Sequence, residues 1–123
     1  MIYLGLDYGK KKVGLSIGNQ SLAEPYMVIR YQNQDNLIKQ IEDIIKKEGV
    51  DKVIVGVSEN EMGHESREFA KLLNADTYDE TLTSQDAVRL SIQGGVKREK
   101  RKEMEDAYAA TIMLQNYLDS KKD

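Results

Sequence analysis

Three acidic residues in this sequence combine a type and a position that could support chemistry. Asp7 follows the apolar run 2–6, Glu80 ends a short stretch with strand character, and Asp106 heads a C-terminal helical pattern. Burying a lone carboxylate costs several kcal/mol unless it is paired or binds a metal. If the three acids converge, divalent cations between them would relieve their repulsion. Two such ions about 4 Å apart can activate a water for attack on a phosphodiester. The hypothesis is therefore a metal-dependent hydrolytic site.

Asp7 lies at the mouth of a predicted β-hairpin. The apolar run 2–6 and the alternating run 12–18 flank a short turn that contains glycine and lysine, which is the pattern of two antiparallel strands. Strand parity places Asp7 on the same face as Gly5. Gly5 and Gly14 bring no side-chain bulk, so another group can approach the carboxylate closely. The alternative interpretation of Asp7 is an ordinary turn residue.

Glu80 closes the predicted short strand 77–80. Functional groups in open α/β sheets gather at the carboxyl ends of strands. If this strand is a parallel neighbour of the first strand, it brings Glu80 near Asp7. Asp79 would then point to the opposite side of the sheet. The alternative interpretation of Glu80 is a turn residue that merely follows a strand.

Asp106 heads an apolar stripe in the predicted C-terminal helix. Counting by i+4, i+7 and i+11, it shares a line with Ala110, Met113 and Tyr117, a stripe that should face the sheet. An acid at the head of a buried stripe breaks the usual pattern, and such breaks often mark functional sites. The alternative is a surface acid that pairs with Lys102, one helical turn earlier.

Composition limits the ligands that such a site could use. The 123 residues contain no cysteine and a single histidine, His64, so thiolate and multi-histidine metal sites are excluded. Carboxylate oxygens favour magnesium or manganese. The sequence also has no signal-peptide pattern and no apolar run of the roughly 18 residues that a membrane span needs. Together with the absence of cysteine, this leads us to expect a cytoplasmic protein that does not contact membranes.

Two basic clusters are candidates for contact with nucleic-acid phosphates. The net charge of −3 argues weakly against tight nucleic-acid binding, but the distribution of charge matters more than its sum. One cluster, Lys10 and Lys11, occupies the hairpin turn and continues into Lys12. For this cluster, and for the second one that follows, the alternative is a run of charged residues that is simply exposed to solvent. The second cluster precedes Asp106 and comprises Lys97, Arg98, Lys100, Arg101 and Lys102.

The remaining patterns predict an α/β fold with a mixed five-stranded sheet flanked by helices. Three antiparallel strands come first, and helices and strands then alternate, which favours parallel pairing for the later strands. Pro25 is expected to open the third strand, where proline is tolerated. The length suits one domain over residues 1–123. The predicted strands are 2–6, 12–18, 26–31, 52–57 and 77–80, and the predicted helices are 34–48, 62–73, 83–92 and 100–118.

Four segments, taken in order, resemble the motifs of one nuclease family. The family's first-strand motif resembles Leu6-Asp7-Tyr8-Gly9-Lys10-Lys11-Lys12-Val13-Gly14, and its central strand resembles Val53-Ile54-Val55-Gly56-Val57. Its acidic strand end resembles Asp79-Glu80-Thr81-Leu82-Thr83-Ser84, and its closing segment resembles Gln93-Gly94-Gly95 followed by Asp106-Ala107-Tyr108-Ala109-Ala110. Over nearly its whole length, the chain thus resembles the YqgF (RuvX) family of RNase H-like nucleases. That family is described as candidate Holliday junction resolvases or pre-16S rRNA processing nucleases.

The resemblance implies an RNase H-like fold and a metal-dependent nuclease. The catalytic metal ligands would be Asp7, Glu80 and Asp106, the cofactor Mg²⁺ or Mn²⁺, and the substrate structured RNA or branched DNA. Two departures from the family pattern bear on substrate affinity. Ser58 stands where proline usually follows the central strand, and Thr81 replaces an arginine that would contact phosphate.

Two other classes of function remain open from the sequence. A catalytically silent RNase H-like module could bind nucleic acid without cutting it, although the three acids argue against this. The actin-like ATPases also place an Asp-x-Gly hairpin around phosphate, but one domain of this length lacks their second lobe. We expect a monomer or a weak homodimer. Metal-dependent cleavage of nucleic acid is the observation that separates these classes.

Overall fold

A mixed five-stranded sheet forms the centre of the structure, a computed structural model that describes residues 1–57, 62–79 and 104–120. The strand order is β3-β2-β1-β4-β5. Neighbouring strands among the first three are antiparallel, whereas β4 runs parallel to β1 and β5 parallel to β4. The predicted mixed α/β sheet is therefore confirmed. The strands are β1 (Tyr3–Tyr8), β2 (Lys12–Gly18), β3 (Ala23–Arg30), β4 (Lys52–Val57) and β5 (Asp76–Asp79).

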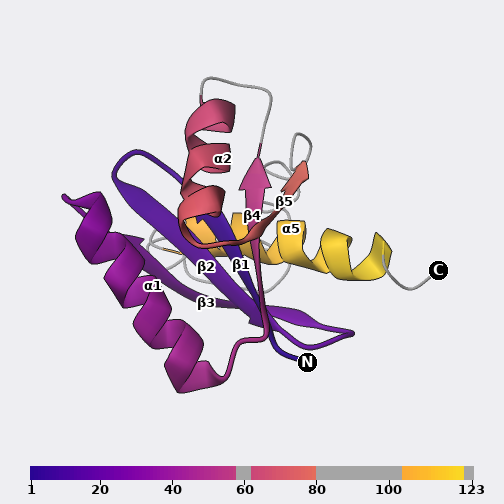
Figure 1. Ribbon diagram of the computed structural model, residues 1–123. Coiled ribbons are helices and arrows are strands. Elements are labelled where there is room, and N and C mark those ends of the chain that lie inside the picture. Colours follow the sequence, from indigo (N-terminus) through magenta and orange to yellow (C-terminus); the bar gives the residue numbers. More distant parts are fainter. Residues whose placement is uncertain (58–61, 80–103, 121–123) are drawn as a thin grey trace.

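Three described helices cover the two faces of this sheet: α1 (Gln34–Glu48), α2 (Met62–Leu72) and α5 (Glu105–Ser120). Figure 1 shows α1 and α2 in front of the sheet and α5 behind it. The bounds of α1 follow from its caps. Asn33 accepts hydrogen bonds from two backbone amides of the first turn, and Gly49 ends the helix in the left-handed region with φ 66°.

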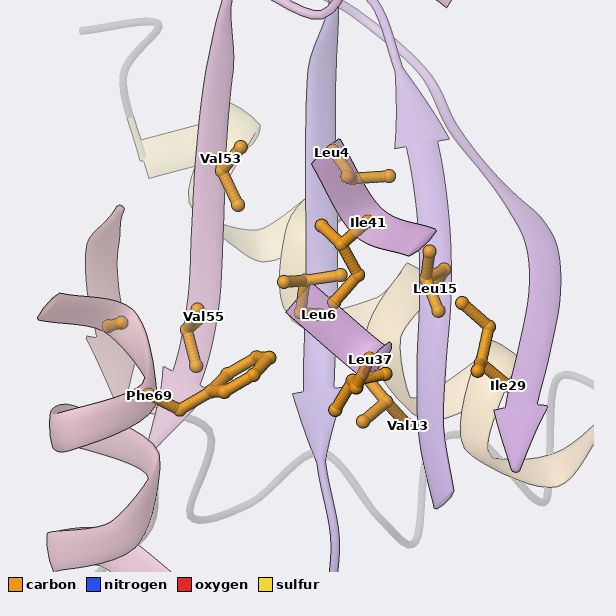
Figure 2. Packing of buried hydrophobic residues seen from close by; sticks show 11 residues of the cluster. Leu4, Leu6, Val13, Leu15, Ile29, Leu37, Ile41, Val53, Val55 and Phe69 are labelled. Atoms are coloured by element: carbon orange, nitrogen blue, oxygen red, sulfur yellow. The ribbon is translucent and has the colours of Figure 1, made fainter. Parts of the chain in front are cut away.

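The main core lies between the sheet and the helices α1 and α2. Residues of one parity on the strands point toward these helices, so alternate positions are buried together. Figure 2 shows strand side chains directed at Leu37 and Ile41 of α1 and at Phe69 of α2. The strand residues of this cluster are Leu4, Leu6, Val13, Leu15, Ile29, Val53 and Val55.

A second core lies on the opposite face, under α5. Ile54 of β4 and Tyr3 of β1 pack there against Met113 and Tyr117, two residues of the predicted apolar stripe. Because both faces of β4 are covered, its near-continuous apolar sequence is buried throughout. The predicted orientation of the last helix is thereby confirmed.

Several predicted boundaries differ from the structure. Pro25 lies inside β3 rather than at its start, which is compatible with an edge strand and with the register shift at Ser16 opposite it. β1 extends through Asp7, and α5 begins at Glu105. The predicted helix 83–92 lies outside the described residues. Within the described ranges, no helix is both long enough and apolar enough to cross a lipid bilayer.

The position of β5 corrects one expectation from the sequence. β4, not β5, is the parallel neighbour of β1, so β5 lies two strands away from Asp7, on the order of 10 Å. The long apolar run of β4 takes the place beside β1 because its residues are buried on both faces there.

Candidate metal-binding site

Asp7 lies within β1, with a glycine beside it on each neighbouring strand. In the sheet register, Asp7 pairs with Gly14 of β2 and with Gly56 of β4. Residues paired in register point to the same face, so the two positions flanking the carboxylate on that face carry no side chain. Asp7 is half-buried, and the helix on its face is α5. Neither neighbouring strand therefore places a side chain directly beside Asp7 on this face.

The first turn of α5 lies directly on Gly14. A Cβ atom added to this glycine would be 2.0 Å from the carbonyl oxygen of Asp106 and 2.7 Å from the backbone nitrogen of Ala107. Only glycine permits so close an approach of helix backbone to strand. Because Gly14 pairs with Asp7, this contact places the Asp106 backbone beside the Asp7 position. The structure therefore brings the backbone of Asp106 close to the strand position of Asp7, the first of the three predicted acids.

Further contacts hold α5 in this position. The buried Ser16 hydroxyl donates a hydrogen bond to the carbonyl oxygen of Ala110 over 3.0 Å. A Cβ atom on Gly5 would be 2.9 Å from the Cβ of Leu114, so the helix lies close to β1 as well. Farther along, the Gln115 side chain accepts a hydrogen bond from the backbone amide that opens β3 and donates one to a preceding carbonyl. Asp106 therefore projects from a fixed helix.

Neighbouring groups neutralise only part of the negative charge of the Asp106 carboxylate. Nζ of Lys12 lies 3.0 Å from its Oδ2. That oxygen is nevertheless buried and accepts no hydrogen bond from the described residues, because the ammonium lies within ion-pairing distance without hydrogen-bond geometry. Asp106 also lies in the first turn of α5, where the helix dipole favours negative charge. A buried oxygen with spare acceptor capacity suits a cation.

The carboxylate oxygens of the three predicted acids suit a hard divalent cation. Only Asp7 and Asp106 are among the described residues. Among residues 1–57, 62–79 and 104–120, no group of three potential ligands surrounds one point. Glu80 lies outside the described residues, so its predicted position is untested. Tyr78 of β5 pairs with Gly56 and packs against Tyr117 of α5, so its side chain lies on the α5 face of the sheet. Tyr78 precedes Glu80 by two residues in the sequence.

The remaining predicted site residues have different outcomes. Lys10 and Lys11 are exposed in the β1–β2 turn, as expected. His64, the single histidine, is exposed too and lies in the first turn of α2, within the predicted helix 62–73. The departures at Ser58 and Thr81 fall outside the described residues. So does the second basic cluster, Lys97, Arg98, Lys100, Arg101 and Lys102.

Sequence reasoning missed two residues of this site. Lys12 was grouped with the turn lysines, yet it is the ion-pair partner of Asp106, where the local alternative had been Lys102. Parity along β2 gives a signal for this, since Lys12 lies two residues from Gly14 and therefore on the same face. Gly56, which lies in register with Asp7 on the other neighbouring strand, had no local signal, because its position beside Asp7 depends on the register of β4 with β1.

The arrangement of strands and helices is that of the RNase H-like nucleases. RuvC of Thermus thermophilus, solved with a Holliday junction substrate, matches 98% of this chain and 96% of its own with a TM-score of 0.61 at 15% identity. The fowlpox virus resolvase, solved with Holliday junction DNA, matches all of both chains with a TM-score of 0.65, also at 15% identity. These similarities establish the fold alone.

Sequence similarity is more specific. Residues 1–120 match the RuvX family, described as Holliday junction resolvases, and the chain belongs to this family. A relative from Caldanaerobacter subterraneus, named as a candidate pre-16S rRNA nuclease, is 37% identical over 99% of both chains. Another, from Clostridium tetani and named in the same way, is 36% identical over 98% of this chain and 97% of its own.

Proposed function

We propose that this chain is a metal-dependent nuclease that hydrolyses phosphodiester bonds of structured nucleic acid. Its candidate substrates are pre-16S rRNA, from the names of the relatives, and four-way DNA junctions, from the family description. The observation that carries the proposal is the close contact of Asp106 with Gly14, which lies in register with Asp7. A divalent cation bound beside these two acids would add to the partial neutralisation that Lys12 gives Asp106.

In this proposal Asp7, Glu80 and Asp106 hold Mg²⁺ or Mn²⁺. When bound, a divalent cation supplies Lewis-acid stabilisation of charge on the phosphoryl oxygens and activates water for attack. The chain's own contribution is positioning. β1 and the packed α5 position the backbones of Asp7 and Asp106, and the lysines of the hairpin turn attract the nucleic-acid backbone.

Cleavage assays test this function directly. The purified chain would be incubated with a labelled four-way DNA junction and with a precursor rRNA fragment, each with manganese or with chelator. We expect cleavage of at least one substrate in manganese and none in chelator. Binding without cleavage under every metal condition would instead identify a catalytically silent nucleic-acid-binding module. Equal cleavage in chelator would contradict the metal requirement.

Replacing Lys12 by methionine should increase the effect of metal on stability. The ammonium of Lys12 neutralises part of the Asp106 charge and also repels an incoming cation. In chelator we expect the Tm of Lys12→Met to fall by at most a few °C, because a partly exposed ion pair contributes at most about 1 kcal/mol. In manganese, its Tm should rise by more than that of the wild type. Thermal unfolding with a manganese titration measures both.

The matched control is Lys52→Met. Lys52 forms a similar ion pair with Asp76, 2.9 Å long, at the opposite end of β4. Its loss should leave the manganese-induced rise in Tm at the wild-type value. The role assigned to Lys12 would be wrong if Lys12→Met and the wild type showed equal rises.

A further inference from the structure

An open cavity lies between the β1–β2 turn and the end of β3. It has a volume of about 660 Å³ and is lined by Lys10, Lys11, Arg30, Tyr31 and Gln32. Three of these five residues are cations. In the part of the chain that the structure describes, no acid forms an ion pair with any of the three. Among the described residues, the lining of the cavity therefore has an excess of positive charge, which favours an anionic ligand.

The backbone that surrounds this cavity is held in place. The amide of Gly9 donates a hydrogen bond to the carbonyl oxygen of Lys12 over 3.0 Å and closes the turn. Tyr31 fastens the turn to β3 twice, because its amide donates to Lys11 and its hydroxyl to the Gly9 carbonyl oxygen, 2.5 Å away. Burial, with the Tyr8 hydroxyl nearby, raises the pKa of Tyr31, so this hydroxyl stays a neutral donor. Positively charged side chains thus extend from a preorganised frame.

Arg30, one of the cations that line the cavity, lies on the same face of the sheet as Asp106. Arg30 pairs with Lys12 in the β2–β3 register, and Lys12 is on the face of Asp106. Residues paired across strands point to one face, so Arg30 shares that face too. It lies two strands from β1, on the order of 10 Å. A nucleic-acid backbone lying over Asp7 would continue past Arg30.

We propose that this cavity binds a backbone phosphate next to the scissile one, with the guanidinium of Arg30 as its main ligand. Arginine presents a planar fork of donors that matches the oxygens of a phosphate, whereas Lys10 and Lys11 act as point charges at its side. Lys12 is engaged by Asp106 and does not contribute. The proposal rests on the nuclease function above and adds a phosphate site that orients the strand relative to the acids.

The salt dependence of binding tests this site without cleavage. Binding of a fluorescently labelled four-way DNA junction and of a labelled precursor rRNA fragment would be measured in chelator over a series of salt concentrations. The logarithm of the association constant falls as the logarithm of the salt concentration rises. Loss of one phosphate contact makes this slope shallower by about 0.7 to 0.9. We expect this reduction for Arg30→Met with at least one of the two probes.

The control is Arg67→Met, which removes the same charge from an exposed position of α2, on the opposite face of the sheet. Its slope should equal that of the wild type. The proposal is overturned by an unchanged slope in Arg30→Met, by an equal reduction in Arg67→Met, or by a wild type that binds neither probe. A wild type that binds with the expected slopes but never cleaves in manganese would contradict the nuclease function and leave the phosphate site standing.

A scan with neutral methylphosphonates then identifies the phosphate. Single phosphates of the better-bound probe would be replaced one at a time, and affinities compared between the wild type and Arg30→Met. At the phosphate that Arg30 contacts, the replacement should weaken the wild type but leave Arg30→Met unchanged. Equal losses for both proteins at every position would contradict a localised site.

Discussion

Replacing Asp7 by asparagine should reduce metal-dependent cleavage by about 10³-fold or more. The amide keeps the shape of the carboxylate but loses the charge that would hold a divalent cation. Metal ions contribute several kcal/mol of transition-state stabilisation, and each tenfold in rate corresponds to about 1.4 kcal/mol. The measurement is the single-turnover rate in manganese on the substrate that the wild type cleaves.

The same variant should remain folded. Asparagine keeps the shape of the aspartate side chain, so in chelator the Tm of Asp7→Asn should stay close to that of the wild type. The control is Asp76→Asn, an exposed strand acid paired with Lys52, which should keep wild-type cleavage. A large loss of stability in Asp7→Asn would show that the carboxylate has a structural role. Cleavage at the wild-type rate would show that the site lies elsewhere.

The parts of the fold that could be predicted from the sequence are those that local patterns determine. The run 52–57 is apolar at nearly every position, and its strand has those bounds in the structure. The stripe of α1 and the glycine after it gave the helix its correct ends, because an amphipathic period and a left-handed cap are both local signals. Asp106 was placed at the head of the apolar stripe of the last helix for the same reason, although that helix was predicted to begin near residue 100.

The parts that could not be predicted depend on contacts between distant segments. The order of parallel strands is set by packing over the whole sheet, so local pattern could not exclude a β5 lying directly beside β1. The partner of Asp106 comes from β2, far away in sequence, whereas a local count suggested Lys102. The cavity beside Arg30 arises only when β3 meets the hairpin turn.

The site also shows why glycine positions carry more information in the structure than in the sequence. Gly14 was recognised as space next to a carboxylate, but what fills that space is the backbone of α5. The relative position of the two acids therefore depends on how α5 packs on the strands, and the contact at Gly14 is the part of that packing that involves Asp106 itself. A change that leaves every charged group in place should still destroy the site if it moves this helix.

Replacing Gly14 by alanine makes that change. The added methyl group would lie 2.0 Å from the carbonyl oxygen of Asp106 and 2.2 Å from its carbonyl carbon, and backbone atoms cannot rotate away. Overpacking costs about 1 to 3 kcal/mol, and we expect the upper end, with a fall in Tm on the order of 10 °C. Displacing Asp106 by about 1 Å should also lower cleavage by roughly 10²-fold at a temperature where the variant is folded. Urea unfolding and single-turnover cleavage measure the two effects.

Gly49→Ala separates loss of stability from loss of the site. Gly49 has φ 66° and nothing within 4 Å of an added Cβ atom, so alanine there meets backbone strain of about 1 to 2 kcal/mol but no clash. It ends α1, on the other face of the sheet from Asp106. Below its unfolding transition, Gly49→Ala should therefore cleave at the wild-type rate while Gly14→Ala does not. If both variants cleave at the wild-type rate, the position of Asp106 on Gly14 does not control the chemistry, and the role of α5 as the support of the metal-binding acids is wrong.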